Sequence, residues 1–555
     1  MKKLNSLALA VSLLAGAQSA NALTPWVDGA PDITIITSGG AAQDKAYGQV
    51  VNDTLAAAGT LDTFGDLDTT INVVGARWTA FYFTGNASLG LGLAGKKILL
   101  KKRTQGAAGY GIVPVISAIP LEQLVVEGTA LANWTANGVN GWKRDINAGN
   151  AATTLVKQIS DAGFSGVDAD ILLKPGTQNY PVPVPELSTG LVEPGWPTTL
   201  KALPATFTVA NTGGLVYGVA VTLDLYKVLQ AAEKRAGRLP STVAIGTYGE
   251  DSLPNLNRNV IASLLAGKVG AWDQIKIVDK TDANTVKSLL HTDILTDAGV
   301  TGPYKEATSG KNLTPVAFGK RNNGAAVGAV ASSKFLNYPA ELNAFAPAIA
   351  TPDNAVVEDA SLPIIKAPTT AGDTGSLLKD WQNGTNTTGF NNVLDGAAPA
   401  KRWGIAINTA DRNSAVTAAG TGGDPWRYIK IDGYAPTLEN VATGNYPHWA
   451  EGVVIYLKTK ATDAQWALKT KFLKTFANDL GSPTIANLVN TTQAWGKTGI
   501  FATTKDPRGF VATIPFNTAS PVVPFTHIKT APKSHVEVVP VADNAAKGGL
   551  QLQLK

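Results

Sequence analysis

Three short apolar strands in this chain each run directly into a loop of small residues. The strands are predicted at 32–38, 98–102 and 314–321, and the loops at 37–41, 105–111 and 322–328. A helical pattern over 43–58 follows the first loop, so a strand, a tight turn and a helix succeed one another as in an α/β unit. Because ligands bind at the carboxyl ends of strands in such sheets, the pattern predicts an α/β fold with one site built from three loops.

Composition excludes several kinds of site. The chain has 555 residues, no Cys, one Met and four His, and a net charge of +5. Without Cys there is no disulfide, thiolate zinc site, iron–sulfur cluster or Cys nucleophile. The four His residues lie far apart in the sequence, so we expect no metal centre and no cofactor. A charge of this size on a chain of this length gives no reason to expect nucleic-acid or membrane-surface binding.

Catalytic signatures are absent or incomplete. The chain contains no Gly-x-Ser-x-Gly elbow and no His-Glu-x-x-His motif. Residues 90–97 nearly match a phosphate-binding loop, but Lys97 stands where Ser or Thr must bind magnesium. His448 and Glu451 are spaced three residues apart, and we expect them to be exposed polar residues. No catalytic residue is therefore assigned and we expect a non-enzyme, with a secreted hydrolase as a remote alternative.

The first 22 residues are typical of a secretory signal peptide. Lys2 and Lys3 form a basic start, residues 7–16 a short apolar core, and Ala20 and Ala22 the small residues of a cleavage site. The apolar core is too short to span a bilayer, which takes about 20 residues. We expect cleavage after Ala22 and a mature protein in the periplasm or outside the cell, without stable membrane insertion.

The order of the motifs resembles that of the periplasmic phosphate-binding proteins of ABC importers, within the wider type 2 solute-binding fold. The resemblance covers residues 32–500 and rests on these segments: TSGGA at 37–41, the 105–109 loop, Val167-Asp168-Ala169, LLAGKVGAW at 264–272, RNNGAAV at 321–327 and the stretch 432–449. It implies a two-lobed α/β fold of the periplasmic-binding-protein type 2, in which each lobe is a mixed sheet flanked by helices and a ligand cleft lies between the lobes.

The same resemblance implies a set of ligand-binding residues. They are Thr37, Ser38, Gly39, Gly40, Gln105, Ala107, Ala108, Asp168, Arg321, Asn323, Gly324, Ala325, Ala326 and Val327. Arg321 would pair with an anion, and Asp168 would accept a proton from a bound oxyanion. The family supplies hydroxyl side chains where this chain has Ala107, Ala108, Ala325 and Val327. The missing hydroxyls predict weak or no phosphate binding and a different ligand.

The resemblance also implies a domain division and a function. Strands expected at 215–222 and 427–432 flank the middle of the chain, so lobe one is expected to combine 23–220 with 430–555 and lobe two to cover 221–429. The implied function is an exported solute-binding protein for an oxyanion or another small solute, with the permease of an ABC importer as partner. The alternative is a non-catalytic surface or scaffold protein that reuses the fold.

Several local patterns predict structure directly. Apolar residues at steps of four predict a helix over 462–480, and a weaker pattern predicts one over 154–162. The stretch 206–222 is expected to form two buried strands around Gly213 and Gly214. The basic stretch Lys96, Lys97, Lys101, Lys102 and Arg103 is expected to be a solvated flank of a strand, with an electrostatic funnel toward the 105–111 loop as the alternative.

Overall fold

The computed structural model describes most of the chain from Gly29 onward. The described residues are 29–68, 73–127, 133–200, 202–301, 314–339, 344–351, 362–391 and 400–503, with the short strands β23 (Val522–Val523), β24 (Glu537–Val539) and β25 (Gln551–Gln553). The expected signal peptide, residues 1–22, lies outside the described residues. Within them, no helix is long and apolar enough to cross a lipid bilayer.

One continuous mixed sheet runs through the molecule. Its strands follow one another in the order β15 (Ile364–Lys366), β14 (Ala317–Gly319), β16 (Gly404–Thr409), β10 (Phe207–Thr222), β19 (Trp449–Leu457), β9 (Ala162–Ser165), β1 (Ile33–Gly39), β4 (Lys97–Arg103), β3 (Val73–Thr84), β2 (Asp62–Asp68), β7 (Gly141–Asp145) and β6 (Thr135–Ala136). Strands β17 (Trp426–Tyr428) and β22 (Ile500–Thr503) also pair with β10. The pairs β1–β4 and β14–β16 are parallel, whereas β10 pairs antiparallel with both of its neighbours.

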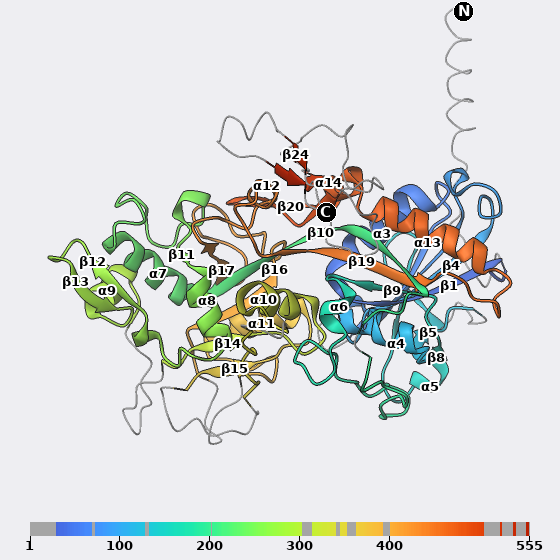
Figure 1. Ribbon diagram of the computed structural model, residues 1–555, viewed down its shortest axis with the longest axis horizontal. Helices are drawn as coiled ribbons and strands as arrows, with labels where there is room; N and C mark the ends of the chain where they lie inside the picture. Colours follow the sequence, from blue (N-terminus) through green and yellow to red (C-terminus); the bar gives the residue numbers. More distant parts are fainter. Residues whose placement is uncertain are drawn as a thin grey trace, which may run out of the picture.

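Strand β10 joins the two halves of the molecule (Figure 1). Its first part, from Phe207 to Val216, pairs with β19, and its last part, from Tyr217 to Val221, pairs with β16. The sequence predicts two strands here, but the structure has one, with an irregular register between Asn211 and Gly214. The chain therefore has the two-lobed α/β architecture that the sequence predicts, and the sheets of the lobes are continuous through β10.

Helices cover the sheet in both lobes (Figure 1). The first lobe carries α3 (Asp44–Val50), α4 (Val113–Ser117), α5 (Ala151–Thr154), α6 (Ala169–Leu172), α13 (Trp466–Leu480) and α14 (Pro483–Val489). The second carries α7 (Leu223–Arg235), α8 (Arg258–Leu265), α9 (Thr292–Ala298), α10 (Ala326–Leu336) and α11 (Ala371–Asn383). The short helix α12 (Leu438–Ala442) follows later in the chain. The ring of Tyr47 on α3 lies 4.5 Å from that of Phe476 on α13 and 5.2 Å from that of Phe164 on β9, so both helices share one aromatic core.

Short two-stranded sheets complete the fold. They pair β5 (Leu121–Leu124) with β8 (Leu155–Gln158), β11 (Asn255–Leu256) with β18 (Lys430–Ile431), β12 (Lys276–Asp279) with β13 (Thr285–Ser288), β20 (Thr491–Gln493) with β21 (Gly496–Thr498), and β24 with β25. The helix expected over 154–162 is wrong, because α5 ends at Thr154 and β8 begins at Leu155. Leu155 pairs with Leu124 in β5 while Val156 and Ile159 are exposed, so tertiary pairing overrides the weak helical pattern.

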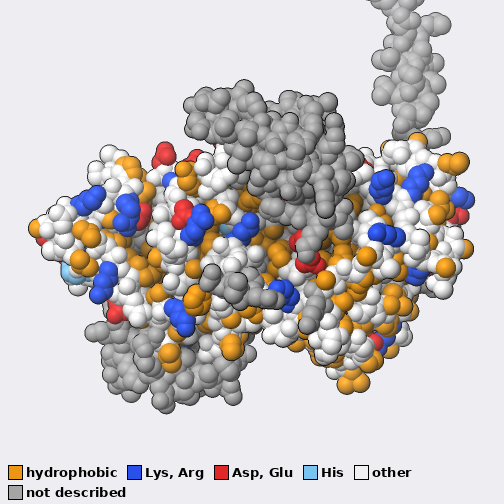
Figure 2. Space-filling view, in the orientation of Figure 1, with side chains coloured by type: hydrophobic (Ala, Val, Ile, Leu, Met, Phe, Trp, Pro, Cys, Tyr) orange, Lys and Arg blue, Asp and Glu red, His pale blue; other side chains and the backbone are white. Residues whose placement is uncertain are grey.

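The solvated flank expected for the basic stretch is also wrong for three of its members. Lys101, Lys102 and Arg103 are at most 2% exposed, because β4 lies in the interior of the sheet between β1 and β3. Lys101 pairs with Glu127 at 2.7 Å, Lys102 pairs with Asp44 on α3, and Arg103 pairs with Glu186 at 2.6 Å. Lys and Arg side chains are scattered over the face shown in Figure 2 rather than gathered into one patch.

Candidate functional site

The hydroxyl groups of the first predicted loop point into the protein interior. Thr37 Oγ1 shares a hydrogen bond with the Tyr47 hydroxyl at 2.9 Å and donates to the Lys101 carbonyl at 2.8 Å. Ser38 Oγ donates to the Tyr110 carbonyl at 2.9 Å. Gly39 has φ +131° and leaves no room for a Cβ, which would lie 1.9 Å from the Phe164 carbonyl oxygen. The first loop is therefore fixed by its own contacts.

The three predicted loops lie together in the structure. A Cβ on Gly40 would lie 3.1 Å from the Ala108 nitrogen, which places the first loop against the second. The second loop reaches the third across the two lobes, because the Gly109 N–H donates to the Gly324 carbonyl at 2.9 Å. The strand order therefore brings the three loops together, as expected for the carboxyl ends of strands in an α/β sheet.

Pro181 occupies the space between the second and third loops. A Cβ on Gly109 would lie 2.4 Å from Pro181 Cβ, and a Cβ on Gly324 would lie 2.6 Å from the same atom. Since real Cβ atoms do not approach that closely, only glycine fits on either side of this proline. The predicted cleft is filled here by a segment of the same chain.

The charged residues of the predicted set have partners of their own. Arg321 has φ +73° and is 7% exposed, and its guanidinium donates to the carbonyls of Pro368 at 3.2 Å and Thr369 at 2.9 Å. Burial lowers the pKa of Arg321 to about 10, because the guanidinium loses hydration. Asp168 caps α6 by accepting from the Asp170 N–H at 3.0 Å.

The remaining predicted residues lie in the second and third loops and at the start of α10. Gln105 accepts from Arg103 at 3.5 Å, Ala107 has φ +63°, and Ala108 is 1% exposed. Asn323 is half-buried and lines a small cavity. Ala325 is the N-cap residue of α10, and Ala326 and Val327 form its first turn. Ligand contact by these residues stays a prediction.

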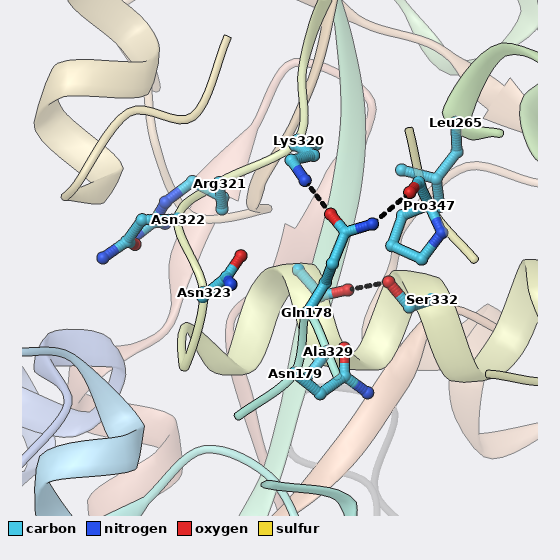
Figure 3. Close-up of a pocket in the computed structure, with 11 residues that line it drawn as sticks. Gln178, Asn179, Leu265, Lys320, Arg321, Asn322, Asn323, Ala329, Ser332 and Pro347 are labelled. Carbon is cyan, nitrogen blue, oxygen red and sulfur yellow. Dashed lines mark hydrogen bonds between the residues drawn. The ribbon is translucent and has the colours of Figure 1, made fainter. Parts of the chain in front are cut away.

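The cavity that Asn323 lines is polar, lies beside the predicted loops and is built around Lys320 (Figure 3). The Gln178 side chain enters it, where its carbonyl accepts from Lys320 Nζ and its amide donates to the Pro347 carbonyl. Figure 3 shows the Arg321 side chain directed away from Gln178. About 10 Å³ remains open, which is room for one water molecule.

Lys320 is a buried cation without a carboxylate partner in the described part of the chain. It is 6% exposed, and none of the ion pairs found among the described residues includes it. Burial lowers the pKa of Lys320 to about 8, because the ammonium loses hydration without gaining a counter-charge. Burying a charge without a partner is costly, and such groups cluster at functional sites.

Sequence reasoning does not find this cavity. Gln178 and Asn179 belong to a stretch without a helix or strand pattern, and Lys320 stands at the end of a predicted strand. The available signal is the pair of adjacent cations, Lys320 and Arg321, immediately after that strand. The Asn179 amide nitrogen and the Asn322 carbonyl oxygen are buried and lack a partner among the described residues.

The expected exposure of His448 and Glu451 is wrong. His448 is fully buried against Tyr217 and Phe335, and Glu451 is 4% exposed and accepts from Asn211 at 2.9 Å. Burial lowers the pKa of His448 to about 3, so the imidazole is neutral at physiological pH. His448 directly precedes β19 and Glu451 lies in it, and this central position in the sheet buries both side chains.

Three carboxylates in the second lobe lie close enough to hold a metal ion: Asp279, Asp282 and Asp293. The ammonium of Lys287 already lies among them, at 3.0, 2.7 and 2.6 Å respectively. Arg235 adds a second cation, 2.8 Å from Asp279. This cluster is therefore an ion-pair network.

Comparison with known proteins gives similarities to solved structures alone. No family model matches the chain, and no curated protein sequence matches it. The chain is similar to a putative phosphate ABC transporter substrate-binding protein with bound phosphate from Clostridium perfringens, with 12% identity over 51% of this chain and 69% of that chain, at a TM-score of 0.25. It is also similar to an ABC-type phosphate transport receptor from Vibrio cholerae, with 10% identity over 60% of this chain and 77% of that chain, at a TM-score of 0.25.

A phosphate-binding protein from Stenotrophomonas maltophilia is similar over 67% of this chain and 83% of its own, with 10% identity and a TM-score of 0.25. These proteins are of the class that the sequence motifs resemble. At such TM-scores the backbones superimpose poorly, so the chemistry of the cleft has to come from this chain's own contacts.

Proposed function

We propose that the chain is a two-lobed solute-binding protein whose ligand is a small organic acid held beside Lys320. The observation that carries the proposal is the buried ammonium of Lys320, which lies where the two lobes meet and has no carboxylate partner among the described residues. A ligand carboxylate at this position would supply the missing counter-charge. Charge-assisted hydrogen bonds of this kind are roughly twice as strong as neutral ones.

The neighbouring groups support an anionic ligand. Arg321 follows Lys320 in the chain and bonds backbone carbonyls, which carry no full charge. The two adjacent cations therefore give this part of the cleft a positive potential in a poorly hydrated setting. Asn179 and Asn322 each have an unpartnered buried atom that lines or adjoins the same cavity and is available to orient a ligand.

The contacts of the predicted loops argue against phosphate in that place. The Gly40 N–H donates to the Phe164 carbonyl at 3.3 Å and the Gly109 N–H to the Gly324 carbonyl, so two of the backbone donors near the cleft are already used. The hydroxyls of Thr37 and Ser38 are also used within the protein. A phosphate there would have to break existing hydrogen bonds before it gained its own.

We propose that the protein is exported, that lobe one comprises 23–220 with 430–555 and lobe two 221–429, and that the lobes open and close about the strands that join them. An importer permease is the proposed partner. The filled cleft also favours a second candidate, a non-catalytic scaffold protein that binds no solute.

Titration calorimetry on the purified protein tests the proposal. The probes are acetate, lactate, succinate and citrate, with phosphate and sulfate as inorganic anions. We expect one of the organic acids to bind and its affinity to fall at least tenfold in Lys320→Met, whereas Lys276→Met, at an exposed lysine on β12, leaves it unchanged. Absence of binding by every organic acid, both in this protein and in variants in which the segment that fills the cleft is weakened, would favour the scaffold protein. Equal affinity in Lys320→Met would place the site elsewhere.

A further inference from the structure

A long connection without regular structure runs between α6 and β10. Its described residues, 173–200 and 202–206, contain neither a helix nor a strand. Connections of more than about 12–15 residues without secondary structure are uncommon in compact domains and are usually functional when they are ordered. The part from Lys174 to Val184 lies in the cleft described above, and we call it the cleft segment.

The first half of the cleft segment is bound to the second lobe. The Gln178 N–H donates to the Tyr338 hydroxyl at 2.8 Å, and Lys174 Nζ donates to the Pro339 carbonyl at 3.1 Å. The Gln178 side chain bonds Lys320 and the Pro347 carbonyl. A carboxamide has the shape of a carboxylate and here presents its oxygen to Lys320, where the proposed ligand would place its own oxygen.

The second half of the cleft segment is bound to the first lobe. The Val184 N–H donates to the Tyr110 hydroxyl at 2.6 Å, and Tyr110 follows Gly109 near the end of the 105–111 loop. Just beyond the segment, Glu186 pairs with the buried Arg103. Between these two attachments Pro181 fills the gap that Gly109 and Gly324 leave between the lobes.

We propose that the cleft segment is a resident occupant of the ligand cleft and that the solute binds by displacing it, with Gln178 holding the place of the ligand carboxylate. This inference rests on the proposed function. The space left beside Gln178, about 10 Å³, admits a water molecule and no organic acid, so the segment has to move before a solute can reach Lys320.

The displacement makes the apparent affinity depend on how firmly the segment is held. If the open form is a small fraction of the molecules, the apparent Kd is the intrinsic Kd divided by that fraction. Weakening the segment raises the fraction and tightens apparent binding, even though no ligand contact is added. A Gln178 that touched the ligand instead would act in the opposite direction, because its removal would weaken binding.

Two variants weaken the cleft segment at separate points. Gln178→Ala removes the bonds to Lys320 and Pro347, and Pro181→Gly removes the ring between Gly109 and Gly324. Pro185→Gly is the matched control, since Pro185 is exposed and follows the segment. Affinity is measured by calorimetry with succinate and lactate, and hydrogen exchange of the amides of Gln178 and Val184 is measured with and without the acid that binds.

We expect both variants to bind about tenfold more tightly than the parent, Pro185→Gly to bind like the parent, and the acid to speed exchange at both amides. Binding by the variants alone, with none by the parent, also supports the proposal. Binding by the parent that is unchanged or weaker in both variants, or that leaves exchange unchanged, overturns the resident occupant while the solute-binding function stands. Absence of binding by the parent and by both variants overturns the proposed function and, with it, the inference that rests on it.

Discussion

Replacing Lys320 by methionine should stabilise the protein at neutral pH, although the proposed ligand would be lost. Methionine has a similar volume and no charge, so Lys320→Met removes the cost of burying an ammonium that lacks a counter-charge. It also leaves the Gln178 carbonyl without its donor. The two effects oppose each other, and their sizes decide the sign.

Burial lowers the pKa of Lys320 from 10.5 to about 8. Below pH 8 both folded and unfolded chains are protonated and the full cost is present, about 3 kcal/mol for 2.5 pH units at 1.36 kcal/mol each. Between pH 8 and 10.5 the unfolded chain binds the proton and the folded chain does not, so the parent gains stability as pH rises. The lost hydrogen bond costs the variant about 1 kcal/mol at every pH. The free energy of unfolding of the variant should therefore exceed that of the parent by about 2 kcal/mol at pH 7 and fall below it by about 1 kcal/mol above pH 10.5. The two free energies should be equal near pH 10.

Urea unfolding followed by tryptophan fluorescence at a series of pH values measures this difference, since the chain has 12 Trp residues. The comparison of variant with parent cancels the groups that titrate equally in both. Lys276→Met is the control and should give a small difference with no crossing, because Lys276 is exposed. A Lys320→Met difference that stays flat from pH 7 to pH 10.5 would refute the desolvation argument.

Three further predictions follow from the same contacts. Phosphate should give no micromolar binding in calorimetry, and a micromolar affinity that disappears in Arg321→Ala would contradict our interpretation of the loops. Glu186→Ala should cost about 3–5 kcal/mol in urea unfolding because it leaves the buried Arg103 without a carboxylate partner, and a loss under 1 kcal/mol would mean that water reaches the guanidinium. Lys287→Met should destabilise the protein at neutral pH, because Asp279, Asp282 and Asp293 lose their shared cation. The hydrogen bond from Lys287 lowers the pKa values of Asp282 and Asp293, and hydrogen bonds from Thr281, Arg235 and Lys287 lower the pKa of Asp279. The stability difference from the parent should therefore shrink in urea unfolding as pH falls through and below 3.8, and a difference that is independent of pH would count against the network.

Local sequence patterns predict the regular elements well where one face is strongly apolar. The helix expected over 462–480 is confirmed as α13, Trp466–Leu480, because Phe472, Phe476 and Leu480 repeat at steps of four and are all buried. The strand before the first small-residue loop is confirmed as β1, because its β-branched residues are buried between β4 and β9. In both, the side chains that stabilise the element are neighbours along the chain or along one face.

Patterns with a weak apolar face fail, because partners distant in the sequence decide the outcome. Leu155 is part of a strand because β5 offers it an antiparallel partner, Leu124. Lys101 and Arg103 are buried because Glu127 and Glu186 supply counter-charges. No sequence pattern identifies either carboxylate as the partner of these cations. Burial of a charge depends on its partner, and the partner is known only once the chain has folded.

The sequence by itself determined the α/β class and the loops at the ends of the strands, because these depend on periodicity and on glycine at tight turns. The two lobes followed from the resemblance of its motifs to those of the periplasmic phosphate-binding proteins. Only the tertiary structure decided what fills the cleft between those loops. Gln178 and Pro181 reach it from a connection without a periodic pattern. Folding decides which residues lie next to Lys320, and none of its described neighbours supplies a carboxylate. Whether a cleft is open or occupied depends on distances between segments far apart in the chain, and local sequence patterns carry no information about those distances.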